Sequence, residues 1–184
     1  MKNLLKISFL SLFFIGLFTI LSGNSLSAQT KTIDLRTYSE RNGNTYYLVF
    51  TASKPNGGTG HAFITFGKQD RRARQSEMAS YGLYGTGEIS ILGKMSGEVR
   101  READYRYNYR NSAKLIVKVN KRQLDMAYRV VSNYSAKGNY KILTRDCAEM
   151  VLTAAKTIGL KTPRRNLFRN AYPYTMLTSL ISAN

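Results

Sequence analysis

The chain of 184 residues contains one cysteine, Cys147, and one histidine, His61. A single cysteine cannot form an internal disulfide, so a lone thiol in an exported chain is either buried and inert or functional. One cysteine and one histidine also fall short of the four ligands of a structural zinc site. We therefore expect no metal site and no cofactor, and these two residues become the first candidates for chemistry.

Acidic residues are scarce as well. The sequence has 11 Asp and Glu residues and 28 Lys and Arg residues, which gives a formal net charge of +17 at pH 7. Such a surface attracts anionic partners. We expect an anionic polymer of the cell envelope, either a peptidoglycan peptide or lipid head groups, and keep nucleic acid as an alternative. The charge does not specify a reaction, and the sequence does not identify a protein inhibitor.

A long apolar run occurs at the N-terminus and nowhere else in the sequence. Two lysines precede the apolar residues 7–21, and small residues then lead to a cleavage site near Ser27 or Ala28. This order is typical of a secretory signal peptide, and the run is short for a membrane-spanning helix, with a retained signal anchor as the alternative. The sequence predicts a signal peptide over 1–28, a periplasmic or secreted protein, and a single domain over 29–184.

The predicted domain mixes strand-like and helical segments. Runs rich in β-branched and aromatic residues predict strands, and apolar residues at helical spacing predict helices. The strands are expected at Thr45–Ala52, Ala62–Phe66, Met78–Tyr84, Asp104–Arg110, Lys114–Val119 and Tyr140–Leu143, and the helices after Asn120, from Cys147 to Ile158, and over Met176–Ile181. The glycine-rich stretch 82–97 is expected to be largely irregular.

Two helices begin with the pattern of a capping box. Asn120 with Gln123 and Asp146 with Glu149 have the spacing at which two side chains and two backbone amides satisfy each other. The second box places Cys147 at the first position of its helix.

Cys147 and His61 have the positions that thiol chemistry requires. Unpaired amides and the helix dipole stabilise a thiolate at a helix start, and a nearby imidazole acts as the base. Asp146 and Glu149 oppose this effect, because their negative charges lie beside the thiol. The alternative is structural: Cys147 lies on the apolar face of its helix, where a buried cysteine is common, and His61 satisfies a backbone carbonyl.

Four short motifs resemble the circularly permuted branch of the NlpC/P60 papain-like superfamily, in which the histidine precedes the cysteine. They are Gly60–Phe66 (Gly-His-Ala-Phe-Ile-Thr-Phe), Ser80–Tyr84, Tyr140–Cys147 and Ile158–Pro163, and together they span about residues 45–163. The resemblance implies an α+β papain-like domain. In this fold an antiparallel sheet carrying His61 packs against the helix that begins at Cys147.

The resemblance also implies an exported thiol-dependent hydrolase, an amidase or endopeptidase, with cell-wall peptides as the expected substrate. Cys147 would attack the carbonyl, His61 would carry the proton, and the Cys147 amide would help to hold the oxyanion. An acyltransferase or lipid-ester hydrolase is one alternative. A non-catalytic basic protein that binds an anionic envelope surface or nucleic acid is another.

The sequence departs from the family pattern in two places. Asp146 stands before the cysteine, where many relatives have Asn, and no second histidine is available to orient the imidazole. That role would fall to a polar residue on the strand next to His61, and Ser80 and Tyr81 are the candidates. Each of them is also an ordinary strand residue.

The segment Asp104–Arg110 alternates tyrosine with arginine and asparagine. This alternation is a strand pattern, and it resembles an aromatic and basic platform for single-stranded nucleic acid. No nucleic-acid motif accompanies it.

The glycine-rich loop Gly57–Gly60 precedes His61 directly. It lacks the Lys-Ser/Thr pair of a phosphate-binding loop, so we expect it to leave room for substrate beside His61.

Overall fold

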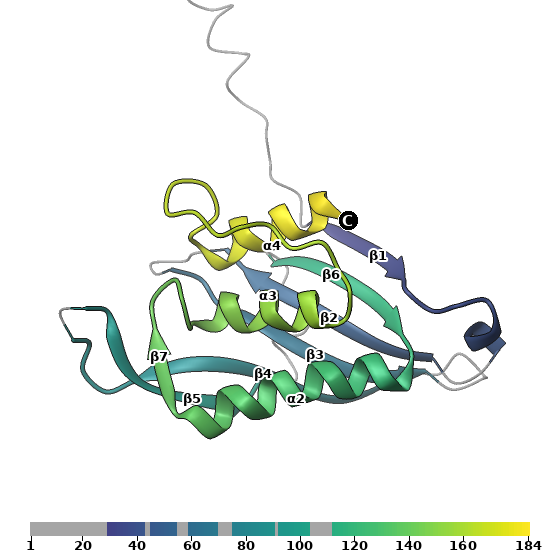
Figure 1. Ribbon diagram of the computed structural model, residues 1–184, viewed down its shortest axis with the longest axis horizontal. Helices are drawn as coiled ribbons and strands as arrows, with labels where there is room; N and C mark the ends of the chain where they lie inside the picture. The colour runs from purple at the N-terminus through teal and green to yellow at the C-terminus, as the bar shows by residue number, and fades with distance from the viewer. Residues whose placement is uncertain (1–28, 43–44, 55–58, 70–74, 91, 104–111) are drawn as a thin grey trace, which may run out of the picture.

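The computed structural model describes residues 29–42, 45–54, 59–69, 75–90, 92–103 and 112–184. They form an α+β unit in which three α-helices accompany one seven-stranded sheet (Figure 1). The strands are β1 (Thr30–Asp34), β2 (Thr45–Ser53), β3 (Ala62–Gln69), β4 (Gln75–Thr86), β5 (Lys94–Arg101), β6 (Ser112–Val119) and β7 (Asn139–Lys141). The helices are η1 (Ser39–Asn42, a 3₁₀ turn), α2 (Lys121–Lys137), α3 (Cys147–Thr157) and α4 (Pro173–Ala183).

The strand order in the sheet is β1-β6-β2-β3-β4-β5-β7. Neighbouring strands are antiparallel except at one edge, where β1 pairs in parallel with β6. In Figure 1 the helices α2, α3 and α4 all lie over the same face of the sheet. The expected α+β class, with a sheet packed against the helix that carries Cys147, is therefore what the structure has.

The core lies between the sheet and these helices. Alternate residues of the central strands point to it, as the period of two requires, and α3 contributes an almost wholly apolar inner face. Its members include Leu48, Phe50, Ile64, Leu115, Val117, Met150, Met176 and Leu177, all of them fully buried. This packing fixes α3 against β3 and so determines where the first residue of α3 lies.

The first predicted capping box is present, and the second is half present. At α2, Gln123 N donates to Asn120 Oδ1 at 2.8 Å, and Asn120 N donates to Gln123 Oε1 at 3.1 Å. At α3, Glu149 N donates to Asp146 Oδ1 at 2.9 Å, as expected. The Glu149 carboxylate, however, lies 3.8 Å from a guanidinium nitrogen of Arg165. It pairs with this cation, which is far away in the sequence, instead of making the predicted reciprocal contact.

The structure corrects several element boundaries. β4 is longer than the predicted strand, and the stretch expected to be irregular contains the end of β4 and the first half of β5. The glycine-rich composition was misleading here. Some of these glycines lie within strands because a neighbouring strand comes too close for a side chain, as the β7 backbone does at Gly97. The helix expected at Met176 begins at Pro173, a residue favoured in the first helical turn.

Two predicted segments lie outside the described residues: the signal peptide over 1–28 and the alternating strand Asp104–Arg110. Gly57 and Gly58, half of the loop expected to leave room for substrate beside His61, lie outside them as well. Within the described ranges, no helix combines the length and the apolar character needed to cross a membrane.

Candidate active site

Cys147 is the first residue of α3, and its thiol lines a pocket of about 480 Å³. The residue is only 5% exposed. Asp146 precedes it with extended backbone angles and caps the helix, as the sequence predicts. The first amides of an α-helix have no partner within the helix, so the thiol lies where unpaired N–H groups gather.

His61 stands immediately before β3 and is held by its backbone. Its N–H donates to Ser53 Oγ at 3.1 Å, and its carbonyl accepts from Ser53 N at 2.9 Å. The imidazole stacks on the Tyr84 ring with 4.4 Å between centroids. Backbone pairing with β2 and stacking on β4 thus leave the ring little freedom.

The structure brings Cys147 and His61 together. Burial disfavours the charged ring, but hydrogen bonds with Cys147 and with Glu102, together with their negative charges, outweigh burial and raise the pKa of His61 to about 9. Because the Nε2 atom lies against Glu102, the Nδ1 atom is the nitrogen available to the thiol. At neutral pH this environment favours the imidazolium form of His61.

Glu102 is the residue that lies against the far side of the ring, and sequence reasoning missed it. Its Oε1 atom is 2.9 Å from His61 Nε2, and its side chain is 1% exposed. The Tyr84 hydroxyl donates to both carboxylate oxygens, at 2.7 and 2.9 Å. A buried carboxylate in these contacts orients the imidazole and stabilises its protonated form.

Gly82 makes this contact possible. Glu102 follows β5 directly, whereas His61 precedes β3, and β4 runs between these two strands. A Cβ atom on Gly82 would lie 2.1 Å from Glu102 Oε1 and 2.4 Å from His61 Nε2. The carboxylate therefore reaches the ring over a position that has to lack a side chain.

Ser80 and Tyr81, the residues expected to orient the imidazole, make their contacts elsewhere. The Ser80 hydroxyl lies 2.7 Å from Thr65 Oγ1. The Tyr81 ring packs edge-on against Phe66 and Tyr128, toward α2. The carboxylate that contacts the imidazole is that of Glu102, whose backbone N–H donates to the Ser80 carbonyl at 2.8 Å. The predicted residues belong to β4, the strand next to β3, whereas the carboxylate follows β5, one strand farther away.

Tyr140 is a second residue that contacts the thiol. Burial, the charges of Cys147 and Asp146, and a hydrogen bond with Cys147 raise the pKa of the Tyr140 hydroxyl. The hydroxyl therefore stays protonated at neutral pH and is a donor directed at the sulfur. Tyr140 also lines the same pocket as Cys147.

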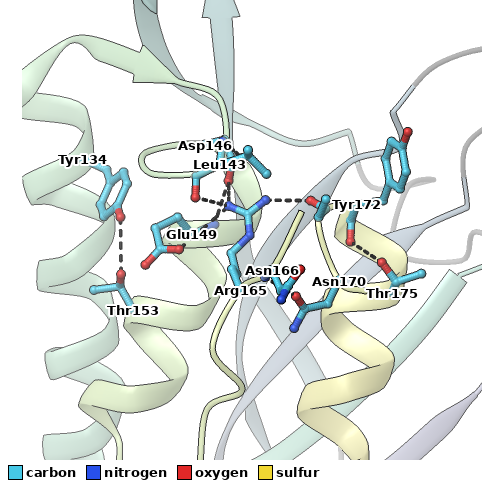
Figure 2. A network of polar contacts seen from close by, with 11 residues as sticks. Tyr134, Leu143, Asp146, Glu149, Thr153, Arg165, Asn166, Asn170, Tyr172 and Thr175 are labelled. Carbon is cyan, nitrogen blue, oxygen red and sulfur yellow. Dashed lines mark hydrogen bonds and ion pairs between the residues drawn. The ribbon is translucent and has the colours of Figure 1, made fainter. Parts of the chain in front are cut away.

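The carboxylate of Asp146 takes part in a network of polar contacts, which Figure 2 shows. Asp146 accepts from Glu149 N at 2.9 Å, from Leu143 N at 2.8 Å and from Arg165 Nη1 at 2.6 Å. The side chains of Asp146 and Arg165 are both 8% exposed. The opposing charge that the sequence places next to the thiol is thus paired with a buried guanidinium.

Arg165 also fixes the chain on both sides of the site. Its guanidinium donates to the Leu143 carbonyl at 2.9 Å and to the Ala171 carbonyl at 2.7 Å. These two residues both line the pocket. One side chain therefore ties the helix start, the turn before it and the loop before α4 to one another.

Leu143 adopts a backbone conformation that leucine disfavours, with φ at 69°. This left-handed region costs a non-glycine residue about 1–2 kcal/mol. Its N–H is held by Asp146 and its carbonyl by Arg165, so the network maintains the conformation. Such backbone outliers cluster at functional sites.

The pocket beside the thiol is mainly apolar. Its walls are Thr59, Gly85, Met95, Tyr140, Ile142, Leu143, Asp146, Cys147, Leu167, Ala171, Tyr172 and Pro173. Among these described residues, Asp146 is the one acidic side chain, and Arg165 neutralises it. The pocket is therefore suited to an uncharged, apolar group.

Within the described ranges, no three His, Cys, Asp or Glu side chains are grouped so that they could hold a metal ion. No family model, curated protein or solved structure matches this chain.

Proposed function

We propose that this protein is an exported thiol-dependent hydrolase of the permuted NlpC/P60 type, with Cys147 as nucleophile, His61 as general base and acid, and Glu102 as the residue that orients the imidazole. The observation that carries the proposal is that the His61 ring interacts with both Cys147 and Glu102. Nucleophile, base and orienting group in this order are the arrangement that activates a thiol.

The reaction begins with the Cys147 thiolate and the His61 imidazolium. The sulfur attacks a carbonyl carbon, and the C–O double bond becomes a single bond to an oxyanion. His61 then gives its proton to the leaving amine or alkoxide as the bond to carbon breaks, which leaves a thioester on Cys147. The neutral imidazole next takes a proton from water, the hydroxide attacks the thioester, and the acid and the thiolate are released.

Two donors are available for the oxyanion. One is the N–H of Cys147 at the start of α3, where helix amides have no partner within the helix. The other is the Tyr140 hydroxyl, which the sequence analysis did not consider. A phenol that remains protonated can donate to the oxyanion as negative charge leaves the sulfur.

A cell-wall peptide remains the proposed substrate by resemblance to the family. The apolar walls around Cys147 also favour a second candidate, an ester or thioester of an apolar acyl group. Both substrates react through the same acyl-enzyme. They differ in what the pocket would hold, an apolar amino-acid side chain or an acyl chain.

The reactivity of the thiol tests the proposal first. The chain has one cysteine, so every iodoacetamide adduct reports on Cys147. Native protein should react at pH 6.5 faster than free cysteine does after correction for nucleophilicity, and His61→Gln should slow the reaction by at least about tenfold. A thiol that reacts only after unfolding would show that Cys147 is a core residue.

Product analysis then separates the enzyme from a binding protein. Wild type and Cys147→Ser are incubated with purified peptidoglycan and, separately, with p-nitrophenyl acyl esters, and the products are measured by mass spectrometry and absorbance. Release that depends on Cys147 supports the proposal and selects the substrate class. Equal release by both forms, or none by either, contradicts it.

A further inference from the structure

The loop between α3 and α4 carries two large apolar side chains to the surface. It runs from Leu160 to Tyr172 and projects beyond both helices in Figure 1, where it is yellow-green. At its tip Leu167 is 66% exposed and Phe168 is 94% exposed. Exposed apolar groups of this size, side by side, are a common mark of an interaction surface.

Polar contacts within the loop hold this tip in place. Asn166 N donates to Asn170 Oδ1 at 2.6 Å, Phe168 N donates to Asn166 Oδ1 at 2.8 Å, and Asn170 Nδ2 donates to the Arg164 carbonyl at 3.1 Å. Asn170 is itself buried. Together with the contacts of Arg165, these hydrogen bonds define one conformation of the loop. The loop therefore holds Leu167 and Phe168 exposed to solvent.

The tip continues into the mouth of the pocket. Leu167, Tyr172 and Ile142 all line the pocket that contains Cys147. Tyr172 is 53% exposed and Ile142 is 45% exposed. We call Ile142, Leu167, Phe168 and Tyr172 the apolar rim. Exposed arginines, Arg164 and Arg169, flank its tip in the sequence.

We propose that the apolar rim docks on an anionic lipid bilayer. Leu167 and Phe168 enter the boundary between head groups and acyl chains, while Arg164 and Arg169 pair with lipid phosphates. An apolar tip between cations, on a chain with a net charge of +17, has the two attractions that interfacial anchors combine. The proposal does not depend on catalysis.

A bilayer fits this surface better than a folded protein partner does. A stable protein interface uses about 20–30 residues on each side. The rim has four exposed side chains, and its most exposed member is Phe168, at 94%. A small apolar tip needs only a few ångströms of penetration to lose contact with water, and a bilayer provides that depth everywhere. Docking of this kind turns the mouth of the Cys147 pocket toward the membrane.

Vesicle sedimentation tests the surface with matched variants that share one N-terminus. Wild type should bind vesicles of phosphatidylcholine with phosphatidylglycerol, and Leu167→Ser with Phe168→Ser should lower the partition constant by at least about tenfold. Tyr38→Ser removes an aromatic side chain that is 85% exposed, next to η1 at the opposite end of Figure 1, and should change binding less than twofold. Equal losses in the two variants would overturn the proposal.

The arginines have their own control. The control is Arg122→Gln with Arg129→Gln, a pair that lies exposed on α2 and removes the same charge. Arg164→Gln with Arg169→Gln should weaken binding to the anionic vesicles by at least about threefold more than this control does. Equal effects would mean that the whole positive surface adheres without orientation, which contradicts a docking loop.

The absence of tryptophan allows a direct reading of insertion. Phe168→Trp should shift its emission to the blue on anionic vesicles and be quenched by brominated acyl chains, whereas Tyr38→Trp should not. A Phe168→Trp emission that stays unshifted on bound vesicles would overturn insertion. A blue shift without lipid that rises with protein concentration, together with a dimer in sedimentation, would assign the rim to a second copy of this chain.

Discussion

Glu102 Oε1 and His61 Nε2 lie 2.9 Å apart although 41 positions separate the two residues in the sequence. Their contact passes over Gly82, at which a Cβ atom would come within 2.4 Å of either partner. The pair is therefore defined by three strands at once: the residue before β3, a glycine within β4 and the residue after β5.

Gly82→Ala should separate the two partners while leaving every reactive group in the chain. The added methyl group clashes with both side chains, so the ring has to move and the proposed dyad with Cys147 is lost. We expect kcat/KM to fall by at least about a hundredfold, as for loss of a positioned base. Circular dichroism checks that the fold is kept. Activity within twofold of wild type would contradict the proposed role of the Glu102–His61 contact.

The ionisation of His61 can be measured without ambiguity, because the chain has one histidine. An NMR titration of its ring should give a pKa of about 9, raised by hydrogen bonds and by the negative charges of Cys147 and Glu102 against the effect of burial. Glu102→Gln and Cys147→Ala should each lower this pKa, since each removes one anionic partner from a buried ring. A pKa that neither variant changes would contradict the arrangement.

The same interaction predicts how stability depends on pH. The folded pKa of His61, about 9, lies above the value of about 6.5 for an unperturbed histidine, so protonation favours the folded state. This contribution is complete below pH 6.5 and is lost as the pH rises toward 9. It amounts to about 3 kcal/mol of the free energy of unfolding. Urea titrations at several pH values should show the decline in wild type, and His61→Gln should lack that part of it.

Arg165→Met should be strongly destabilising. It leaves the buried Asp146 carboxylate without its cation, which in other proteins costs about 3–5 kcal/mol. The double variant Asp146→Asn with Arg165→Met should recover part of the loss, because no buried charge then remains unpaired. Denaturant unfolding measures both. Exposed Arg164→Met is the control and should have an effect below about 0.5 kcal/mol.

Local patterns predicted the parts of the site that depend on a few neighbouring residues. Asp146 before Cys147 has the signature of a helix start, and the apolar spacing after it defines the buried face. His61 between a glycine-rich loop and a β-branched run marks the beginning of a strand. Each of these inferences needs only helix or strand periodicity and capping chemistry, and the structure places both residues accordingly.

Glu102 and Arg165 could not be predicted in this way, because their roles depend on distant pairing. Glu102 reaches His61 only in the observed register of β4 with β5, and the glycines of that region indicated irregular structure instead of a ladder. Arg165 is one of several arginines in a basic tail, and nothing near it in the sequence distinguishes it. A buried glycine opposite a buried carboxylate becomes a signal only when the strand order is known.

The place of β6 in the sheet determines the order in which the strands can assemble. β6 lies between β1 and β2, so β1, the earliest of the described strands, pairs with a strand that the chain reaches only after β2, β3, β4 and β5. Lys31 of β1 also donates to the carbonyl of Ile181 in α4 at 3.3 Å. Because contacts between distant parts of a chain form slowly, the first strand and the last helix should close the domain together, after the central strands have formed around His61.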